Sequence, residues 1–105
     1  MSLPVVAVIK AKPGKEKEAE SMLKGLLAPT HAESGCLLYA LHSVGGDPRT
    51  FIFIENWASA EALQAHLSSS HIASALARQT ELLESLQIMP LEPLVAEKQN
   101  SKGSL

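Results

Sequence analysis

Apolar runs typical of strands alternate along this chain with segments in which apolar residues recur at helical spacing. Residues 5–9 form a continuous apolar run. Because the run does not alternate with polar residues, it predicts a first strand that is buried on both faces. From Lys15 the pattern changes, and an amphipathic helix with one core-facing stripe is expected. The stripe consists of Ala19, Met22, Leu23, Leu26 and Leu27.

The end of this first helix carries a proline. The ring of Pro29 would crowd the carbonyl group of Gly25, so a kink or a tightened last turn is expected there. Ser34 and Gly35 follow, and a glycine at this place predicts a helix end in the left-handed conformation.

Two further strands are predicted at residues 36–44 and 50–57. The turn sequence Gly45-Gly46-Asp47-Pro48 lies between them, so they should form an antiparallel hairpin. The second of these strands also fails to alternate. Both faces of the sheet are therefore expected to be covered, one by helices and the other by a second subunit.

The second half of the chain begins with Ser59, a favourable helix N-cap. Its apolar spacing predicts a short helix, a bend at residues 68–70, and a longer helix that ends at about Leu86. A last strand is expected at residues 87–95. It contains two prolines, which lack the amide donor of a sheet ladder, so it should be an edge, bulged or exchanged strand.

The predicted order of elements is β-α-β-β-α-β, the split arrangement of ferredoxin-like α+β domains. One domain is expected over residues 1–96, followed by a polar C-terminal tail at residues 97–105. Two helices packed on one face of an antiparallel sheet would leave the other face bare. Burial of that face between two copies of the chain predicts a homodimer.

Composition and charge exclude several classes of protein. The 105 residues are 46% hydrophobic with a net charge of −2. With no basic stripe, a nucleic-acid partner is not expected. No signal-peptide pattern and no membrane-spanning apolar run is found, so a cytoplasmic protein without a membrane partner is predicted. The single cysteine, Cys36, excludes an internal disulfide and is expected to be a small buried thiol.

Candidate chemistry first gathers on the strand at residues 50–57. Its alternation places Phe51, Phe53, Glu55 and Trp57 on one face. A carboxyl group among aromatic rings is unfavourable to bury as an anion, so its pKa should rise and suit it to proton transfer. The alternative is that Glu55 binds a backbone amide or a cationic partner.

Histidines supply the other candidates. His66 and His71 are five residues apart, so they can converge only if the chain bends between them. With no cysteine pair and no evident third ligand, a metal site is not expected. Hydrogen bonding or proton transfer by one histidine inside a cavity is the favoured alternative. His31 and His42 are interpreted as structural or exposed.

Several of these segments together resemble one known family. The residues are the run 33–39, the hairpin with Asp47-Pro48, and residues 51–67 with the pattern E-x-W…E-A-L-x-x-H, continued by Ser70-His71-Ile72. Over about residues 3–95 the chain resembles the antibiotic biosynthesis monooxygenase domain family. The resemblance implies a dimeric α/β barrel in which two sheets face each other and the last strand or C-terminal segment reaches toward the partner.

The resemblance also implies a chemistry. Family members that oxidise phenols or quinols use O₂ without metal, flavin or haem, after deprotonation of the substrate. Transferred to this chain, it implies that no cofactor is needed and that Glu55 or His66 is the catalytic base. Trp57, His71, Phe53 and Tyr39 would surround the substrate, a small aromatic or quinone-like ligand. A quinol or phenol monooxygenase is the leading hypothesis.

Two departures from the family pattern and two alternatives accompany this hypothesis. Haem-degrading members carry an asparagine on the first strand, which this chain lacks. The tyrosine and arginine groups of polyketide-oxidising members have no counterpart except Arg78. The alternatives are a non-enzymatic dimeric protein, either ligand-binding or stress-related, and an isomerase of a small carbonyl compound.

Overall fold

A computed structural model describes residues 2–94, 101–103 and 105, and it confirms the predicted order of elements. Four strands and two groups of helices follow one another as expected. A short 3₁₀ helix, Ser101–Gly103, lies in the C-terminal segment. The elements are β1 (Leu3–Ala11), α1 (Glu16–Lys24), α2 (Leu27–His31), β2 (Cys36–Val44), β3 (Asp47–Trp57), α3 (Ala60–Leu67), α4 (Ser70–Ala77), α5 (Gln79–Leu82) and β4 (Leu83–Pro90).

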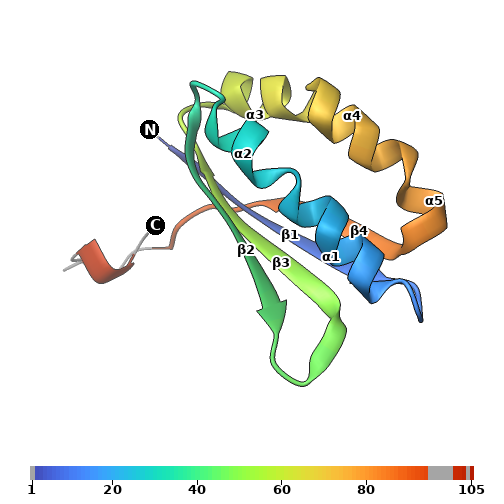
Figure 1. The fold of residues 1–105 in the computed structure, drawn as a ribbon. Helices are drawn as coiled ribbons and strands as arrows, with labels where there is room; N and C mark the ends of the chain where they lie inside the picture. Colours follow the sequence, from blue (N-terminus) through green and yellow to red (C-terminus); the bar gives the residue numbers. More distant parts are fainter. Residues whose placement is uncertain (1, 95–100, 104) are drawn as a thin grey trace.

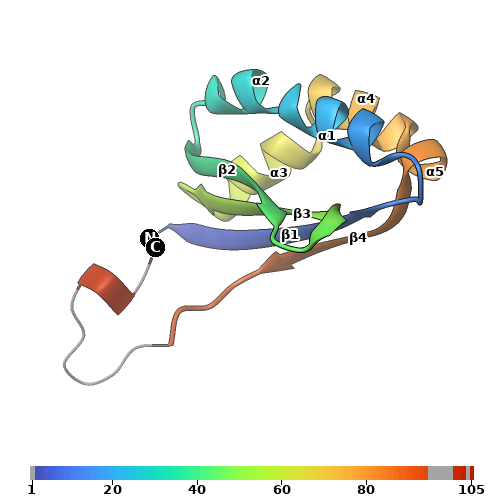
Figure 2. The same cartoon turned by 60° about the horizontal axis from the view of Figure 1, so that its bottom comes forward.

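The strands form one antiparallel sheet in the order β2-β3-β1-β4. Figure 1 and Figure 2 show that the α-helices, from α1 to α5, lie on the same side of this sheet, and that the short 3₁₀ helix lies apart from them. This is the expected ferredoxin-like α+β fold. The sheet is not closed into a barrel: β2 and β4 are its two edges, so one chain does not form the barrel that the resemblance implies.

The two faces of the sheet differ in burial. On β1 the residues that face the helices are all buried, namely Val5, Ala7, Ile9 and Ala11. Val6 and Val8 point to the opposite face and are only half-buried. Among the described residues no helix or strand covers the second face, which the sequence analysis assigns to a second subunit.

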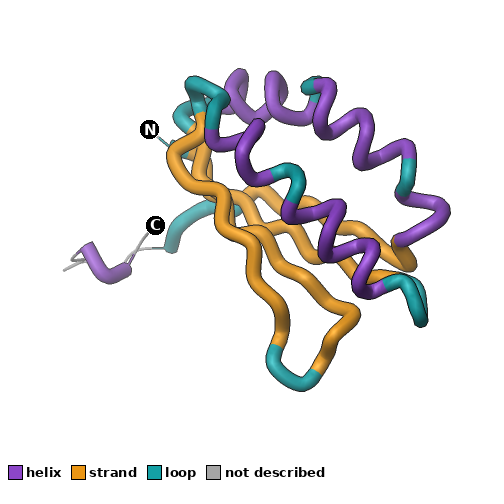
Figure 3. The backbone as a smooth tube through the Cα atoms, in the orientation of Figure 1, coloured by secondary structure: helices purple, strands orange, loops and turns teal. Residues whose placement is uncertain are grey.

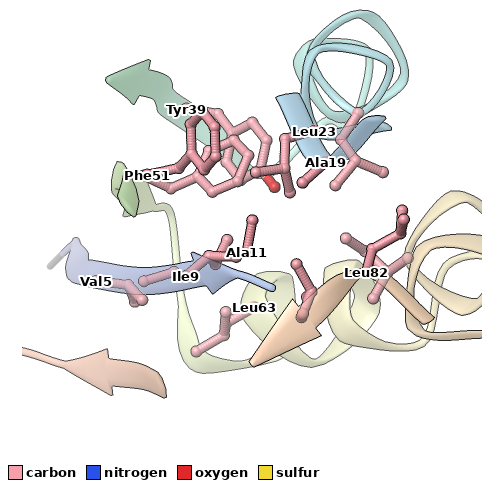
Figure 4. Packing of buried hydrophobic residues seen from close by; sticks show 14 of the residues in the cluster. Val5, Ile9, Ala11, Ala19, Leu23, Tyr39, Phe51, Leu63 and Leu82 are labelled. Atoms are coloured by element: carbon pink, nitrogen blue, oxygen red, sulfur yellow. The ribbon is translucent and has the colours of Figure 1, made fainter. Parts of the chain in front are cut away.

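The core fills the space between the sheet and the helix layer. Figure 4 shows side chains of the sheet, among them Ile9, Tyr39 and Phe51, lying opposite Leu23 and Leu82 of the helices. Phe53 and Trp57 of β3 are among the largest fully or almost fully buried side chains. The third strand thus contributes large aromatic groups to the core, as its alternation predicts.

The first helical segment is broken where the sequence predicts a kink. Helix α1 ends at Lys24, Gly25 caps it, and α2 begins at Leu27 with Pro29 inside it. The break is visible as a loop between two helical segments in Figure 3.

The predicted left-handed end at Gly35 is wrong. Among the described residues, only Gly14 and Gly46 have positive φ angles, at 82° and 81°. Gly35 is required for a different reason, since a Cβ atom there would lie 2.3 Å from Cβ of Ala62. The absence of a side chain lets the turn before β2 approach α3 closely.

The last helix ends earlier than the sequence predicts. It stops at Leu82, and residues 83–86, predicted as helix, begin β4 because Leu83 already pairs with Ala11 of β1. The strand ends at Pro90, so its predicted extension is wrong over residues 91–94, and Val95 lies outside the described residues. The expectation of an edge strand is confirmed, and a register shift next to Ala11 makes the pairing irregular.

Two sequence-based predictions concern the ends and the surroundings of the domain. The predicted boundary between residues 96 and 97 lies outside the described part of the chain. Within the described part, no helix combines the length and the apolar character that crossing a membrane demands.

Candidate active site

A small cavity lies between the sheet and the helices, with a volume of about 60 Å³. Its wall is mostly apolar and is built from all four strands and from α1, α3 and α4. Three polar side chains interrupt the apolar wall: Tyr39, Glu55 and His66. Glu55 and His66, the two residues predicted to be catalytic, thus face one cavity.

Glu55 is buried on β3, with 4% of its surface exposed. Among the described residues its hydrogen-bond partner is Trp57, whose indole Nε1–H donates to Oε1 over 2.9 Å. Burial raises the pKa of the Glu55 carboxyl from its ordinary value of 4.5 to about 7, although the Trp57 hydrogen bond favours the anion and lowers it. The negative charge of Glu33 contributes a further rise. At neutral pH, Glu55 can therefore either give or take a proton.

Aromatic rings hold the polar groups of the cavity in place. Tyr39 stacks on Phe53 with ring centroids 4.5 Å apart, and its edge meets His66 at 5.2 Å. Trp57 packs against both of these rings, with centroids 4.5 Å from that of His66 and 6.2 Å from that of Tyr39. Burial, together with the charge of Glu55, raises the pKa of the Tyr39 phenol. Tyr39 therefore stays neutral and contributes a rigid wall.

His66 lies on α3 with only 3% of its surface exposed. Its Nδ1 atom is 2.8 Å from Oε2 of Glu33. Because a carboxylate oxygen accepts, Nδ1 carries the proton and Nε2 is left as the acceptor nitrogen of the ring. Burial lowers the pKa of His66, while the Glu33 carboxylate opposes this shift. A neutral imidazole of fixed tautomer thus borders the cavity, which is the state of a general base.

The break between α3 and α4 brings the second histidine to the same carboxylate. Ser69 caps α4 by accepting a hydrogen bond from the backbone N–H of Ile72, and the chain changes direction there. His71 follows this bend, and its Nε2 atom lies 2.9 Å from the same Oε2 of Glu33. The bend that the sequence requires for convergence of the two histidines is present.

Glu33 is the site residue that the sequence reasoning did not identify. It lies in the turn between α2 and β2, which backbone hydrogen bonds fix: Cys36 N–H donates to the carbonyl of Glu33, and Ala58 N–H donates to that of Gly35. The contact of Gly35 with Ala62 then sets this turn against α3. The available signal was the position of Glu33 at the start of the run 33–39.

The structure places the other predicted residues at different distances from the cavity. Phe53 and Tyr39 line it, whereas Trp57 and His71 do not belong to its wall and contact His66 from outside. Cys36 is half-buried, and burial raises the pKa of its thiol, which does not favour a reactive thiolate. The remaining histidines, His31 and His42, are exposed, and His31 bonds the carbonyl oxygen of Tyr39.

The cavity is smaller than an aromatic substrate. A protein cavity that holds one benzene ring measures roughly 150 Å³, more than twice the volume present. Leu76 and Ile88 belong to the wall and are also 45% and 42% exposed, so the cavity reaches the surface beside them. Binding of a ring would require these side chains, or Met22, to change rotamer.

Comparison with known proteins decides the family. The sequence profile described as antibiotic biosynthesis monooxygenase matches residues 3–78, which is most of the chain. The chain belongs to the antibiotic biosynthesis monooxygenase family. All three polar residues of the cavity lie within the matched segment, so the site is part of the antibiotic biosynthesis monooxygenase domain itself.

Two curated proteins and a solved structure are similar to most of this chain. YcnE of Bacillus subtilis, provisionally named a monooxygenase, is 34% identical over 77 residues, which cover 73% of this chain and 81% of YcnE. Rv0793 of Mycobacterium tuberculosis, with the same provisional name, is 30% identical over 79 residues, 75% of this chain and 77% of that protein. The crystal structure of PA3566 from Pseudomonas aeruginosa superposes with a TM-score of 0.85 at 35% identity and covers 90% of this chain and 95% of PA3566.

Proposed function

We propose that this protein is a monooxygenase that oxidises a small quinol or phenol with O₂ and needs no cofactor. The observation that carries the proposal is the pair of buried proton-transfer groups, Glu55 and His66, in the wall of one apolar cavity. Membership of the family and the provisional names of YcnE and Rv0793 support the same reaction class.

The reaction begins with removal of a proton from a substrate hydroxyl. Nε2 of His66 accepts this proton, and the resulting phenolate is electron-rich enough to transfer one electron to O₂. The superoxide and the substrate radical combine to form a C–O bond, and the peroxide oxygen takes up a proton. Loss of water then gives the product, so a hydroquinone and O₂ yield a hydroxyquinone and H₂O. The protein supplies the base, the orientation and a dry cavity.

The two proton-transfer groups take complementary roles in this scheme. Burial lowers the pKa of His66, so the imidazole is neutral and accepts the first proton. Burial raises the pKa of Glu55 to about 7, so at neutral pH a large fraction is protonated and can donate to the peroxide. An acid and a base whose environments shift them in this way are typical of proton-transfer sites.

A homodimer forms part of the proposal. The face of the sheet opposite the helices carries Val6, Val8, Ile52 and Ile54, all only half-buried in the single chain. Asn56 lies on the same face, and its Oδ1 atom has no hydrogen-bond partner among the described residues. A second copy packed on this face would cover the apolar residues and complete the barrel.

Oxygen consumption tests the proposed reaction. We expect the protein to consume O₂ with a panel of hydroquinones faster than these compounds autoxidise. His66→Ala should lower kcat by about 10²-fold or more, because the base is removed. Glu33→Gln should lower kcat as well, with a smaller effect on KM. The carboxylate that it removes fixes the tautomer of His66 but lies outside the cavity. The control is Gln64→Ala, which changes an exposed side chain on the same helix as His66.

Three outcomes of this assay would contradict the proposal. If the rate equals autoxidation and a quinone analogue nevertheless raises the melting temperature, the protein binds ligands without turnover. Substrate proton exchange with solvent in the absence of O₂ uptake would indicate the isomerase alternative. An unchanged rate in both His66→Ala and Glu55→Gln would remove the catalytic assignment.

A further inference from the structure

The cluster of Glu33, His66 and His71 has the composition of a metal site. Oε2 of Glu33, Nδ1 of His66 and Nε2 of His71 all lie within 4.8 Å of one another. Two imidazoles and one carboxylate are a common ligand set for divalent transition metals, and they leave further coordination positions open. The three residues come from the α2–β2 turn, α3 and α4, so the cluster is assembled only by the fold.

The two histidines are already aimed at one point. Both ring nitrogens bond the same oxygen, at 2.8 Å and 2.9 Å. An ion lies about 2.0–2.1 Å from an imidazole nitrogen, which is closer than the present Oε2 atom at 2.8 Å and 2.9 Å, so an ion bound to both nitrogens would displace this oxygen. The carboxylate has to withdraw by a rotation of its side chain to become the third ligand. Its side chain is 17% exposed and borders an open surface hollow, which gives it room to do so.

The charge around the cluster favours a cation. Among the described residues, the ion-pair partners of Glu33 are the two histidines, and no lysine or arginine neutralises it. Its negative charge reaches Glu55, Cys36 and Tyr39, and it contributes to the raised pKa of each of the three groups. A bound dication would compensate a carboxylate that lacks a permanent counter-ion.

An ion can reach the cluster from solvent without passing through the apolar cavity. The surface hollow is lined by Glu33 and by Ser69, and the Ser69 hydroxyl lies 3.2 Å from Nε2 of His71. His71 itself is partly exposed, with 19% of its side chain accessible. His66 therefore separates two compartments, with the apolar cavity on one side and the ion-accessible cluster on the other.

We propose that Glu33, His66 and His71 bind one divalent transition-metal ion of the zinc class through Oε2, Nδ1 and Nε2. Coordination of Nδ1 moves the ring proton of His66 to Nε2. Where the proposed function holds, the occupied protein has therefore lost its base, and the ion acts as an inhibitor. The metal site itself does not depend on the proposed function.

Direct binding of Co²⁺ and Zn²⁺ tests the site. Untagged protein stripped with a chelator is titrated with Co²⁺ by visible absorption and with Zn²⁺ by calorimetry. We expect saturation at one ion per chain. His71→Asn should weaken binding at least about tenfold, because it removes the most accessible ligand. His42→Asn should leave binding unchanged, since His42 is an exposed histidine remote from the cluster in sequence.

Two controls separate the possible failures. Circular dichroism and thermal melting without metal show whether His71→Asn folds, and if it does not, Glu33→Gln replaces it as the ligand variant. Nitrogen-15 NMR of labelled histidine reports which ring nitrogen of His66 carries the proton, with no need for turnover. Absence of saturable binding, or equal affinity of wild type and folded ligand variants, would overturn the metal site. Saturable Zn²⁺ binding by a protein that, when metal-free, does not oxidise quinols would contradict only the proposed function.

Discussion

Glu55 is a carboxyl group held among aromatic side chains, and its hydrogen bond with Trp57 only partly offsets its burial. The two residues are neighbours on one face of β3 because side chains two positions apart point the same way. Trp57 donates its indole N–H over 2.9 Å and is itself fully buried. Because side chains alternate between the two faces of a strand, β3 places both this acid and its neutral hydrogen-bond donor in the core.

This arrangement predicts a pH-dependent stability. The pKa of Glu55 is about 7 in the folded protein and about 4.5 when exposed, so the folded state holds a proton that the unfolded state loses between these values. Stability should therefore fall as pH rises from 4.5 to 7, by up to about 3 kcal/mol. Glu55→Gln keeps the acceptor for Trp57 and should remove this part of the slope.

Urea denaturation at a series of pH values measures the effect. The informative quantity is the difference in unfolding free energy between wild type and Glu55→Gln, because other titrating groups, including His66, contribute to both proteins. Glu61→Gln, which changes an exposed carboxylate on α3, is the matched control. Parallel curves for wild type and Glu55→Gln would show that burial does not raise the pKa.

For single residues, the sequence predicts the face of the sheet on which a side chain lies better than it predicts the hydrogen-bond partner of that side chain. Alternation on β3 correctly places Glu55 and Trp57 on one face, but the bond between them depends on the indole orientation that packing imposes. The sequence predicts that His66 and His71 converge only if the chain bends between them. Their spacing alone does not give the angle of such a bend. The role of Glu33 cannot be predicted from local sequence, since its hydrogen-bond partners are 33 and 38 residues distant in the chain.

Among the elements, the turn between α2 and β2 positions the site. It carries Glu33 and touches α3 through Gly35, where an added Cβ atom would lie 2.3 Å from that of Ala62. A tight backbone contact of this kind leaves little freedom for the carboxylate that holds both histidines.

Gly35→Ala should therefore loosen the site as well as the fold. We expect a loss of about 1–3 kcal/mol in unfolding free energy, because the new methyl group forces the turn away from α3. The Glu33–His66 hydrogen bond should weaken with it, and the histidine NMR signals should report a mixture of tautomers. Gly45→Ala is the control, since a Cβ atom there meets nothing within 4 Å and its φ is not positive. Equal stability of the two variants would contradict the assigned role of Gly35.

The wrong predictions of helix ends also arise from contacts between segments that are distant in the sequence. Gly35 looks like a helix-ending glycine because composition cannot distinguish a left-handed residue from a close approach. The end of the last helix was misplaced because residues 83–86 keep an apolar pattern compatible with helix, while pairing of β4 with β1 makes them strand. Local signals such as the Ser59 cap and the weakness at Gly25 predict the structure correctly, since both act within one turn.

For the whole molecule, the decisive feature is a sheet with one covered face. The helices bury the side of β1 and β3 that carries the cavity, and the opposite side exposes branched apolar residues. Exposed apolar surface on a regular sheet is typical of interaction sites. The dimer proposed above would remove it from water without changing the core.

The substitution Ile54→Glu tests this assembly. Ile54 pairs with Val6 and with Ala40 on the open face, so a carboxylate at this position would be buried without a partner at the interface. We expect light scattering to give wild type about twice the chain mass of 11.2 kDa, and Ile54→Glu a mass near that of one chain. Gln64→Glu, at an exposed position of α3 on the helix side of the sheet, is the control and should remain dimeric. A wild type of single-chain mass, or a fully dimeric Ile54→Glu, would contradict the dimer.

The same variant also tests whether the dimer is needed for activity. Ile54 lies beside Glu55 but points away from the cavity, so Ile54→Glu does not alter the cavity wall directly. If Ile54→Glu loses both dimerisation and quinol oxidation, closure of the barrel excludes water from the site.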